Sequence, residues 1–372
     1  MNKIKITTLS PVHIGSGNLL QNNMNFLVVK DGEDSYIHIT DDRKILELIG
    51  ADHVDHWIAS IEKGESTRKL VETYAPASSV SDYAKRRITC YSSGIKLTDT
   101  LKEQIHNGFG IPYIPGSSIK GAIRTAILSV LSDHVRNKEL KIFVQRKVKA
   151  KLIETQLFGR DPNSDLFRFI QVGDAYFEKD STIATRMVNL NIRKKNDLYD
   201  GSKPQLIEAI GVGETATFQM DVKKDFHDFA RRNFPDLKPL PGEMQSLQSL
   251  FKSINNHTSR LIEKEIAFWN EMNLSGSEAY LDVMADMLGE TKSCEDELSC
   301  ILRIGHGSGW RFITGAWTES LENFNEVINA ARPNNQKYSE YPFPKSRRID
   351  EDSDVLGFVK LSLLNDERTE SR

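Results

Sequence analysis

The chain has 372 residues, a formal net charge of −3 and a pI near 6.3, with 39% hydrophobic and 27% charged residues. These values are ordinary for a globular protein, and no apolar run approaches membrane-spanning length. The slightly negative charge argues against a protein that coats nucleic acid indiscriminately. Cys90, Cys294 and Cys300 are widely spaced and form no C-x-x-C motif, so we expect neither a disulfide framework nor a zinc site. The opening residues have no secretory apolar region, so we expect a cytoplasmic protein. We also expect no membrane contact, no metal and no cofactor.

The first third of the chain is predicted to contain sheet strands and one helical insertion. Alternating apolar and polar residues predict a strand at 3–9, followed by a loop, SPVHIGSGN, that contains His13. Two further strands are expected at 25–30 and 35–39, joined by a DGEDS turn. Residues 41–107 are expected to be mostly helical and to form an insertion between sheet elements.

A well-marked helix is predicted next, at 118–132, after the helix-stopping pair Pro115-Gly116. Apolar residues recur at steps of three and four from Ile119 to Leu131, which is the stripe of an amphipathic helix packed on a core. The basic segment 133–157 is expected to continue as a second helix.

The rest of the chain returns to strands after another helical interval. Residues 225–288 are predicted to be helical apart from a proline-rich linker at 234–242, and one more helix is expected from Arg311. Because strands come early and late without regular alternation with helices, we predict the α+β class. Strands or extended segments are predicted at 166–178, 183–194, 206–222, 299–304 and 356–364.

The start of the predicted helix at 118–132 has the features of an anion site. A helix N-terminus offers unpaired amides and a favourable dipole, and Ser117 is placed to act as its N-cap. The alternative is that the basic side chains are solvated helix charges and Ser117 is only a cap. A serine acyl-enzyme of the S-x-x-K type is excluded because its S-D-N and K-T-G partners are absent. The candidate phosphate ligands are Ser117, Ser118, Lys120, Gly121 and Arg124.

A second candidate site is a glycine-rich loop between a predicted strand and a predicted helix. Its glycines would let the backbone approach a ribose-phosphate chain, and its tryptophan could stack on a base. It is neither a Walker loop nor a dinucleotide fingerprint. The alternative is a tight structural turn with the tryptophan in the core. The residues are Gly305, His306, Gly307, Ser308, Gly309 and Trp310.

Histidines and basic clusters complete the candidates. His13 and His306 could act as acid and base in RNA cleavage, although no spacing brings them together and each is more simply a hydrogen-bonding residue. Arg193 and Arg347 are further candidates for RNA contact. Arg347 belongs to a group of basic residues at 345–348. A run of seven Lys and Arg residues at 136–151 is compatible with a polyanion groove or with a solvated face.

The motifs YIPGSSIKGAIRTAIL, RIGHGSGW, QVGDAYF and SPVHIGSG together resemble the RAMP (repeat-associated mysterious protein) superfamily of CRISPR effector complexes. Within it, the chain resembles the end-capping subunit of type III-A Csm complexes, which holds the 3′ part of the CRISPR RNA. The resemblance implies a modified ferredoxin-like, RNA-recognition-motif-like fold. On this basis we expect a core at 1–40 and 108–223, helical insertions at 41–107 and 224–297, and a C-terminal part, 298–372, that completes the core.

The resemblance also implies function and partners. We expect a non-catalytic RNA-binding subunit, with no catalytic residues, that is needed for CRISPR RNA maturation and antiviral defence. The expected partners are CRISPR RNA, neighbouring Csm backbone and small helical subunits, host nucleases for 3′ trimming and, indirectly, target RNA. The alternative is a metal-independent RAMP endoribonuclease that uses histidine. The acidic residue with which the family's backbone subunit cleaves target RNA has no counterpart in the loop SPVHIGSGN.

Overall fold

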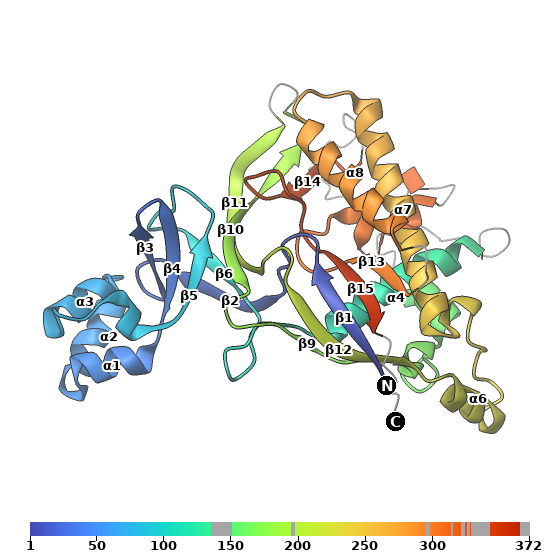
Figure 1. Cartoon of the computed structure of the whole chain (residues 1–372), viewed down its shortest axis with the longest axis horizontal. Helices are drawn as coiled ribbons and strands as arrows, with labels where there is room; N and C mark the ends of the chain where they lie inside the picture. Colours follow the sequence, from blue (N-terminus) through green and yellow to red (C-terminus); the bar gives the residue numbers. More distant parts are fainter. Residues whose placement is uncertain are drawn as a thin grey trace, which may run out of the picture.

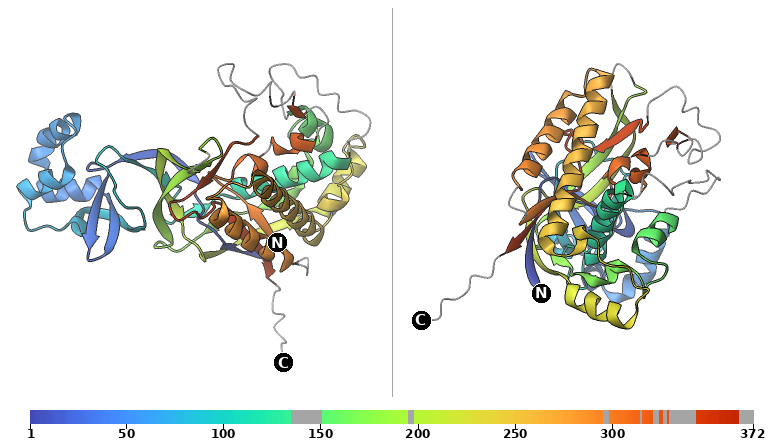
Figure 2. Two further views of the ribbon diagram at one scale, coloured as in Figure 1. Left: turned by 90° about the horizontal axis from the view of Figure 1, so that it is seen from above. Right: turned by 90° about the vertical axis from the view of Figure 1, so that its right-hand side faces the viewer.

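The protein consists of a large body and a smaller lobe that projects from it, as Figures 1 and 2 show. The body contains both chain termini, and the lobe contains the helices nearest the N-terminus. The structure is a computed structural model. It describes residues 1–134, 151–194, 198–294, 298–313, 315–320, 324–325, 328 and 343–364.

A five-stranded antiparallel sheet forms the centre of the body, in the order β13-β15-β1-β12-β8. Along the chain, helix α4 lies between β1 and β8, and helix α7 lies between β12 and β13; β15 comes last. Strands β1 and β8 run parallel with β12 between them, which is the split βαβ unit of ferredoxin-like folds. The predicted α+β class and modified ferredoxin-like core are therefore confirmed. The bounds are β1 Asn2–Thr8, β8 Ile170–Val172, β12 Thr215–Val222, β13 Ser299–Arg303 and β15 Phe358–Leu364.

Helices α4 (Gly116–His134) and α7 (Leu247–Met272) pack on this sheet and on each other. The predicted apolar stripe of α4 is confirmed, since Ile119, Ile123 and Ile127 are fully buried in one core with residues of β1, β12 and α7. A second core lies where α7 and α8 (Glu278–Lys292) meet the other sheet. Burial of apolar side chains from both helices thus holds the two-layer body together.

The second sheet links the body to the lobe. Its path is β2-β6-β11-β10-β5-β4-β3, with β14 paired to β10. The long β10–β11 hairpin lies at its centre, and β5 and β6 flank it in parallel. The bounds are β2 Gly15–Gln21, β3 Phe26–Asp31, β4 Asp34–Thr40, β5 Ala84–Cys90, β6 Thr100–Gln104, β10 Thr182–Asn191, β11 Tyr199–Ile210 and β14 Ser346–Ile349.

The lobe packs three short helices against β3, β4 and β5, with Leu27, Ile45 and Val71 in its core. The prediction that 41–107 is mostly helical is wrong beyond Tyr83, because β5 and β6 lie in that interval. The strand alternation of AKRRITC was obscured by Arg86, a half-buried charge that pairs inside the sheet. The helices are α1 Asp42–Ile49, α2 Val54–Glu62 and α3 Thr67–Tyr74, with 3-10 turns at Ala51–His53 and Val80–Tyr83.

Three other predictions are corrected. The expected strand at 206–222 is two strands, β11 and β12, because a turn with Gly213 at a φ of +81° separates them. The region expected as one helix from Arg311 begins with two 3-10 turns, and helical residues follow at 324–325 and 328. The predicted loop after β1 leads into β2 at Gly15. The remaining elements are α5 Lys151–Phe158, α6 Lys224–Asn233, β7 Tyr113–Ile114, β9 Ala175–Tyr176 and 3-10 turns at Leu166–Phe169, Gly242–Met244, Trp310–Phe312 and Ala316–Ser320.

The segment 133–157 can be compared with the prediction only at its ends. Helix α4 reaches His134, and α5 begins at Lys151. The basic run predicted at 136–151 lies, except for Lys151, outside the described residues.

Candidate nucleic-acid interface

The glycine loop, Gly305–Gly309, follows β13 and lies against the loop after β1. Gly305, Gly307 and Gly309 have φ values of +80°, +88° and +79°, a region of backbone conformation that favours glycine. A Cβ at Gly305 would lie 2.7 Å from the carbonyl oxygen of His13, and one at Gly307 would lie 2.8 Å from Leu356 Cδ1. Both glycines are therefore required by close packing within the protein, whereas a Cβ at Gly309 would meet open space.

This packing brings the two candidate histidines together. The backbone N–H of His306 donates to the carbonyl oxygen of His13 at 2.9 Å, and the two imidazole centroids are 5.9 Å apart. His13 is 2% exposed, and its Nδ1 lies 2.6 Å from the carbonyl oxygen of Glu208. His306 is exposed, and its Nε2 lies 3.3 Å from Gln205 Oε1. Only His306 is thus open to a ligand.

Both imidazoles are neutral at neutral pH. Burial lowers the pKa of His13 to about 4, although the hydrogen bond to Glu208 opposes this shift. The pKa of His306 is lowered by burial and then by the positive charges of Lys102 and Arg348. A neutral His306 can donate one hydrogen bond and accept another, but it contributes no charge to anion binding.

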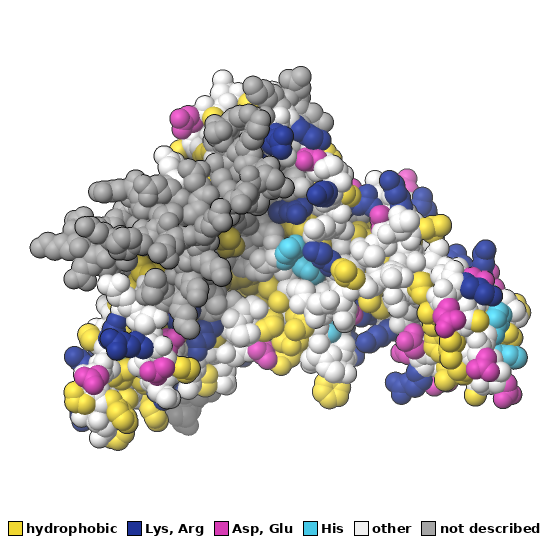
Figure 3. Space-filling view, turned by 180° about the vertical axis from the view of Figure 1, so that it is seen from behind, with side chains coloured by type: hydrophobic (Ala, Val, Ile, Leu, Met, Phe, Trp, Pro, Cys, Tyr) yellow, Lys and Arg dark blue, Asp and Glu magenta, His cyan; other side chains and the backbone are white. Residues whose placement is uncertain are grey.

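Lys102, His306 and Arg348, which we call the basic cluster, form the polar surface beside the glycine loop. Lys102 Nζ donates to Gln205 Oε1 at 2.7 Å, and the pKa of Lys102 is lowered by burial and by the charge of Arg348. Arg348 Nη1 is buried and has no hydrogen-bond partner. Within the described part of the chain, no carboxylate pairs with Lys102 or Arg348. On the face turned away from the viewer of Figure 1, basic side chains gather near the middle of the molecule (Figure 3).

The sequence pattern favoured Arg347, but its neighbour Arg348 belongs to the basic cluster. Both lie on β14, where successive side chains point to opposite faces of a strand. Arg347 is 5% exposed and ion-paired with Glu265 in the interior, so in this structure its guanidinium is not available to RNA. Strand alternation at 346–349 would have shown that the two arginines face opposite sides of a strand, but not which side is buried. Lys102 was missed because residues 100–104, which form β6, were assigned to a helical insertion.

Beneath the glycine loop, Glu265 accepts hydrogen bonds from several buried groups. Arg347 and Arg311 pair with its carboxylate, and Trp269 Nε1 and Tyr280 Oη donate to it at 3.0 and 2.9 Å. Burial favours the neutral acid, but the charges and hydrogen bonds of the two arginines outweigh it, and the pKa of Glu265 falls to about 2. We call these residues the Glu265 network.

Two further loop residues have mainly structural contacts. Trp310 is half-buried, and its ring centroid lies 4.8 Å from that of Phe343 and 5.6 Å from that of Phe324. Ser308 is buried, and its hydroxyl donates to the carbonyl oxygen of Gly305 at 2.5 Å. The alternative of a tight structural turn therefore describes these two side chains well.

The N-terminus of α4 already holds an anion from the protein. The helix begins at Gly116, so Ser117 lies inside the first turn and is not the N-cap. The Gly116 N–H donates to Asp174 Oδ1 at 2.7 Å. A Cβ at Gly116 would lie 2.4 Å from the Val172 carbonyl oxygen, which explains the glycine at the first position of the helix. Ser117 and Gly121 are exposed. With a carboxylate at this position, an RNA phosphate would meet like charge.

Lys120 and Arg124 share one side of α4, but neither is a fully solvated charge. Ser118 is half-buried. Arg124 is ion-paired with Glu154 and with Asp165, each at 3.0 Å, and its guanidinium lies over the Phe158 ring at 4.5 Å. Burial lowers the pKa of the half-buried Lys120. Arg124 thus joins α4 to α5 and to the turn that begins after Asp165.

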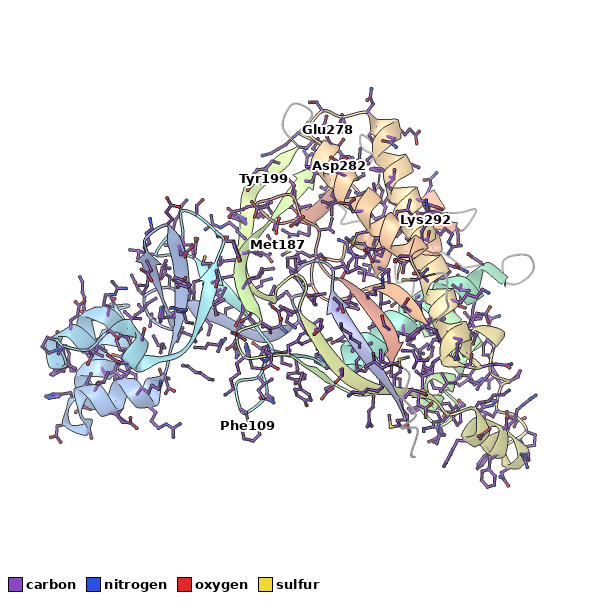
Figure 4. The ribbon with its side chains drawn as sticks, in the orientation of Figure 1. Phe109, Met187, Tyr199, Glu278, Asp282 and Lys292 are labelled. Atoms are coloured by element: carbon purple, nitrogen blue, oxygen red, sulfur yellow. The ribbon has the colours of Figure 1, made fainter. Side chains whose placement is uncertain are left out.

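Arg193 lies far along the β10–β11 hairpin, in the turn after β10. Its backbone N–H donates to Asn191 Oδ1 at 3.1 Å, and the residue is exposed. The neighbouring Tyr199 lies near the start of α8 in Figure 4, well above Met187, which touches the glycine loop. The structure therefore places Arg193 away from the glycine loop and near Arg347, because the end of β10 pairs with β14.

One group of metal-ligand residues exists among the described residues: Glu103, His106 and Glu208, whose ligand atoms lie within 4.8 Å of one another. Arg86 donates to both carboxylates, at 3.0 Å to Glu103 and at 2.8 Å to Glu208. The guanidinium thus supplies the positive charge that a metal ion would bring. We assign the group as an ion-pair network that joins β5, β6 and β11.

Comparison with known proteins agrees with this fold. The model of the RAMP superfamily matches residues 5–312. The chain is 24% identical to the "CRISPR system Cms protein Csm5" of Methanocaldococcus jannaschii over 97% of this chain and 89% of that protein. It also resembles a chain in a cryo-EM structure of a Csm-crRNA-target RNA ternary complex of a type III-A CRISPR-Cas system, with a TM-score of 0.74 and 20% identity. That match covers 97% of this chain and all of the other.

The crystal structure of T. onnurineus Csm5 is similar over the same share of both chains, with a TM-score of 0.64 and 18% identity. In the described residues, no helix is both long and apolar enough to cross a membrane. The family resemblance inferred from the sequence motifs is confirmed, because the matched superfamily model spans most of the chain. This protein belongs to the RAMP superfamily.

Proposed function

We propose that this protein is a non-catalytic RNA-binding subunit of a type III-A CRISPR (Csm) effector complex, which caps the complex where it holds the 3′ part of the CRISPR RNA. Support comes from full-length similarity to a protein named Csm5 and from the likeness to a chain in a Csm-crRNA-target RNA complex. In this role the protein contributes to CRISPR RNA maturation and antiviral defence in the cytoplasm. RNA contact and assembly are its functions, and chemistry belongs to other subunits.

The basic cluster is the observation that carries the RNA-binding proposal. Lys102 and Arg348 are close enough for each charge to affect its neighbours, and no described carboxylate neutralises them. Arg348 keeps a buried N–H without a partner, and such a group costs free energy unless a ligand accepts its hydrogen bond. A phosphate group supplies the missing negative charge and several acceptor oxygens.

The partners follow from the same role. CRISPR RNA binds directly through its backbone, because Lys and Arg side chains read phosphate and sugar and carry little base information. The neighbouring Csm backbone subunit and the small helical subunits contact the protein in the assembled complex. Target RNA is contacted indirectly, and host nucleases trim the 3′ end of the CRISPR RNA beside this subunit.

A charge-matched pair of double variants tests the proposal. Lys102→Gln with Arg348→Gln should weaken binding of a short single-stranded RNA and reduce the slope of log affinity against log salt by about 0.7 for each phosphate that the two side chains neutralise. Lys224→Gln with Arg232→Gln removes the same charge from exposed residues of α6, far from the cluster, and should leave the slope unchanged. Binding is measured by fluorescence anisotropy over a salt series, with circular dichroism as the folding control.

Equal effects of the two double variants would show that only overall charge matters and would refute the basic cluster as the RNA site. In the assembled complex, removal of the cluster should cause loss of this subunit or shortening of the RNA at its 3′ end. Full-length RNA in a complex with normal subunit content would contradict the capping role.

Metal-independent RNA cleavage is the alternative, because the structure brings two imidazoles within 5.9 Å. The burial of His13 weighs against it, since a general acid or base must reach the substrate. Incubation of the purified protein with RNA in EDTA separates the two functions. Intact RNA is expected from the wild type, whereas cleavage that disappears in His306→Ala would establish the enzyme.

A further inference from the structure

Phe109 lies at the tip of the loop that joins β6 to β7. Its side chain is 82% exposed, more than any other large hydrophobic side chain in the described part of the chain. Figure 4 shows the loop projecting from the lower edge of the molecule, with Phe109 at its end. A ring exposed to this extent is free to stack on a planar ligand.

The loop is held in one conformation by its own hydrogen bonds. The side-chain Oδ1 of Asn107 accepts from the N–H groups of Phe109 and Ile111 at 2.9 and 3.0 Å. The N–H of Asn107 donates to the Ile111 carbonyl oxygen at 2.9 Å, and that of Gly110 donates to the Asn107 carbonyl oxygen at 3.0 Å. Because an Asn side chain closes the turn, little conformational entropy is lost when a ligand binds the ring.

The surroundings of the ring favour a nucleobase over a protein surface. Gly108 and Gly110 flank Phe109 and carry no side chain, Ile111 is half-buried, and Pro112 is buried. A protein interface needs a contiguous apolar patch, but the residues that flank Phe109 in this loop add no exposed apolar side chain. A base needs only one flat aromatic partner, and the two glycines leave room beside it for sugar and phosphate.

The loop is also continuous with the candidate interface. The Ile105 N–H donates to the carbonyl oxygen of Ile14, which follows His13. The same strand, β6, carries Lys102 of the basic cluster. Phe109 lies seven positions after Lys102, so the two are at most about 23 Å apart at a strand rise of about 3.3 Å per residue. A few nucleotides of single-stranded RNA can span that distance.

We propose that Phe109 stacks on one base of the RNA whose phosphates contact the basic cluster. The proposal rests on the RNA-binding function proposed above and adds a base contact to it. Stacking is tolerant of base identity, because every base has a π face. The ring would therefore hold the position of the RNA without selecting its sequence.

Three substitutions at Phe109 separate stacking from general apolar contact. Phe109→Ala and Phe109→Leu should each weaken binding of a fluorescein-labelled oligoadenosine about 5- to 150-fold, the range for loss of one base–aromatic stack. Phe109→Trp should bind as tightly as the wild type. The salt slope should be unchanged in all three, because the side chains that bind phosphate remain in place. Phe226→Ala, which removes a 71% exposed phenylalanine from α6, is the matched control and should have no effect.

A series of oligoadenosines that each lack one base locates the contact. One abasic position should weaken binding to the wild type but cause no further loss in Phe109→Ala, as expected when one pair makes the interaction. Wild-type affinity in Phe109→Ala, or full rescue by leucine, would overturn the stacking proposal while leaving the basic cluster intact. Failure of the wild type to bind RNA at all would overturn both proposals.

Discussion

Replacement of Glu265 by Gln tests whether the Glu265 network supports the candidate interface. The carboxylate is 2% exposed and is the shared partner of Arg347 and Arg311. Arg347 precedes Arg348 on β14, so the network and the basic cluster share one strand. A glutamine at position 265 would leave the buried Arg347 without its counter-charge and Arg311 with Glu319 as its remaining carboxylate partner.

The expected loss in the free energy of unfolding is about 3–5 kcal/mol, the usual cost of removing one partner from a buried ion pair. Glu319→Gln is the matched control. Its side chain is 17% exposed and pairs with Arg311 at 3.0 Å and with Lys264 at 3.4 Å. Because solvent screens this pair better, the control should lose about 1 kcal/mol or less.

The pH dependence gives a second measure of the same interaction. The pKa of Glu265 falls from an ordinary 4.5 to about 2 in the folded protein. A lowered pKa contributes stability above pH 4.5 that is lost as the pH falls toward 2, and the full effect is about 3 kcal/mol. The difference in stability between wild type and Glu265→Gln should therefore be largest near neutral pH and should shrink below pH 4.5.

Urea unfolding monitored by tryptophan fluorescence is a suitable assay, because Trp269 is fully buried and donates to Glu265. Adding Arg347→Met to Glu265→Gln should recover part of the loss, since it removes the unpaired charge. A loss below about 1 kcal/mol, or a difference from wild type that does not depend on pH, would refute the assignment of Glu265 as the buried partner of the arginines.

Two further outcomes distinguish structural from RNA-binding residues. Arg124→Ala should lower the free energy of unfolding by about 1–3 kcal/mol, because it removes two partly exposed ion pairs and a cation–π contact. The same substitution should leave the salt slope of RNA binding unchanged. A smaller slope, as the sequence-based hypothesis for Lys120 and Arg124 expects, would restore Arg124 to the RNA site. Gly309→Val should fold, since a Cβ meets open space, but should weaken RNA binding through strain at a φ of +79°. Unchanged binding in the folded variant would make the glycine loop a structural turn only.

Local patterns in the sequence were sufficient for several elements. The stripe from Ile119 to Leu131 predicts α4, because helical burial depends on spacing within one segment. The α+β class and the resemblance to the RAMP superfamily rest on order and motifs and are also confirmed. The strands β5 and β6 were missed, because half-buried charges such as Arg86 and Glu103 interrupt the alternation on which strand prediction depends.

The candidate interface was decided by the tertiary structure. His13 and His306 are almost three hundred residues apart in the chain and meet only because β1, β15 and β13 lie side by side in one sheet. Lys102 and Arg348 join them from two strands of the other sheet. Sequence spacing carries no information on such pairing, because strand order and register depend on long-range contacts. The choice between Arg347 and Arg348 depended on which face of β14 is buried, and the fold alone determines that face.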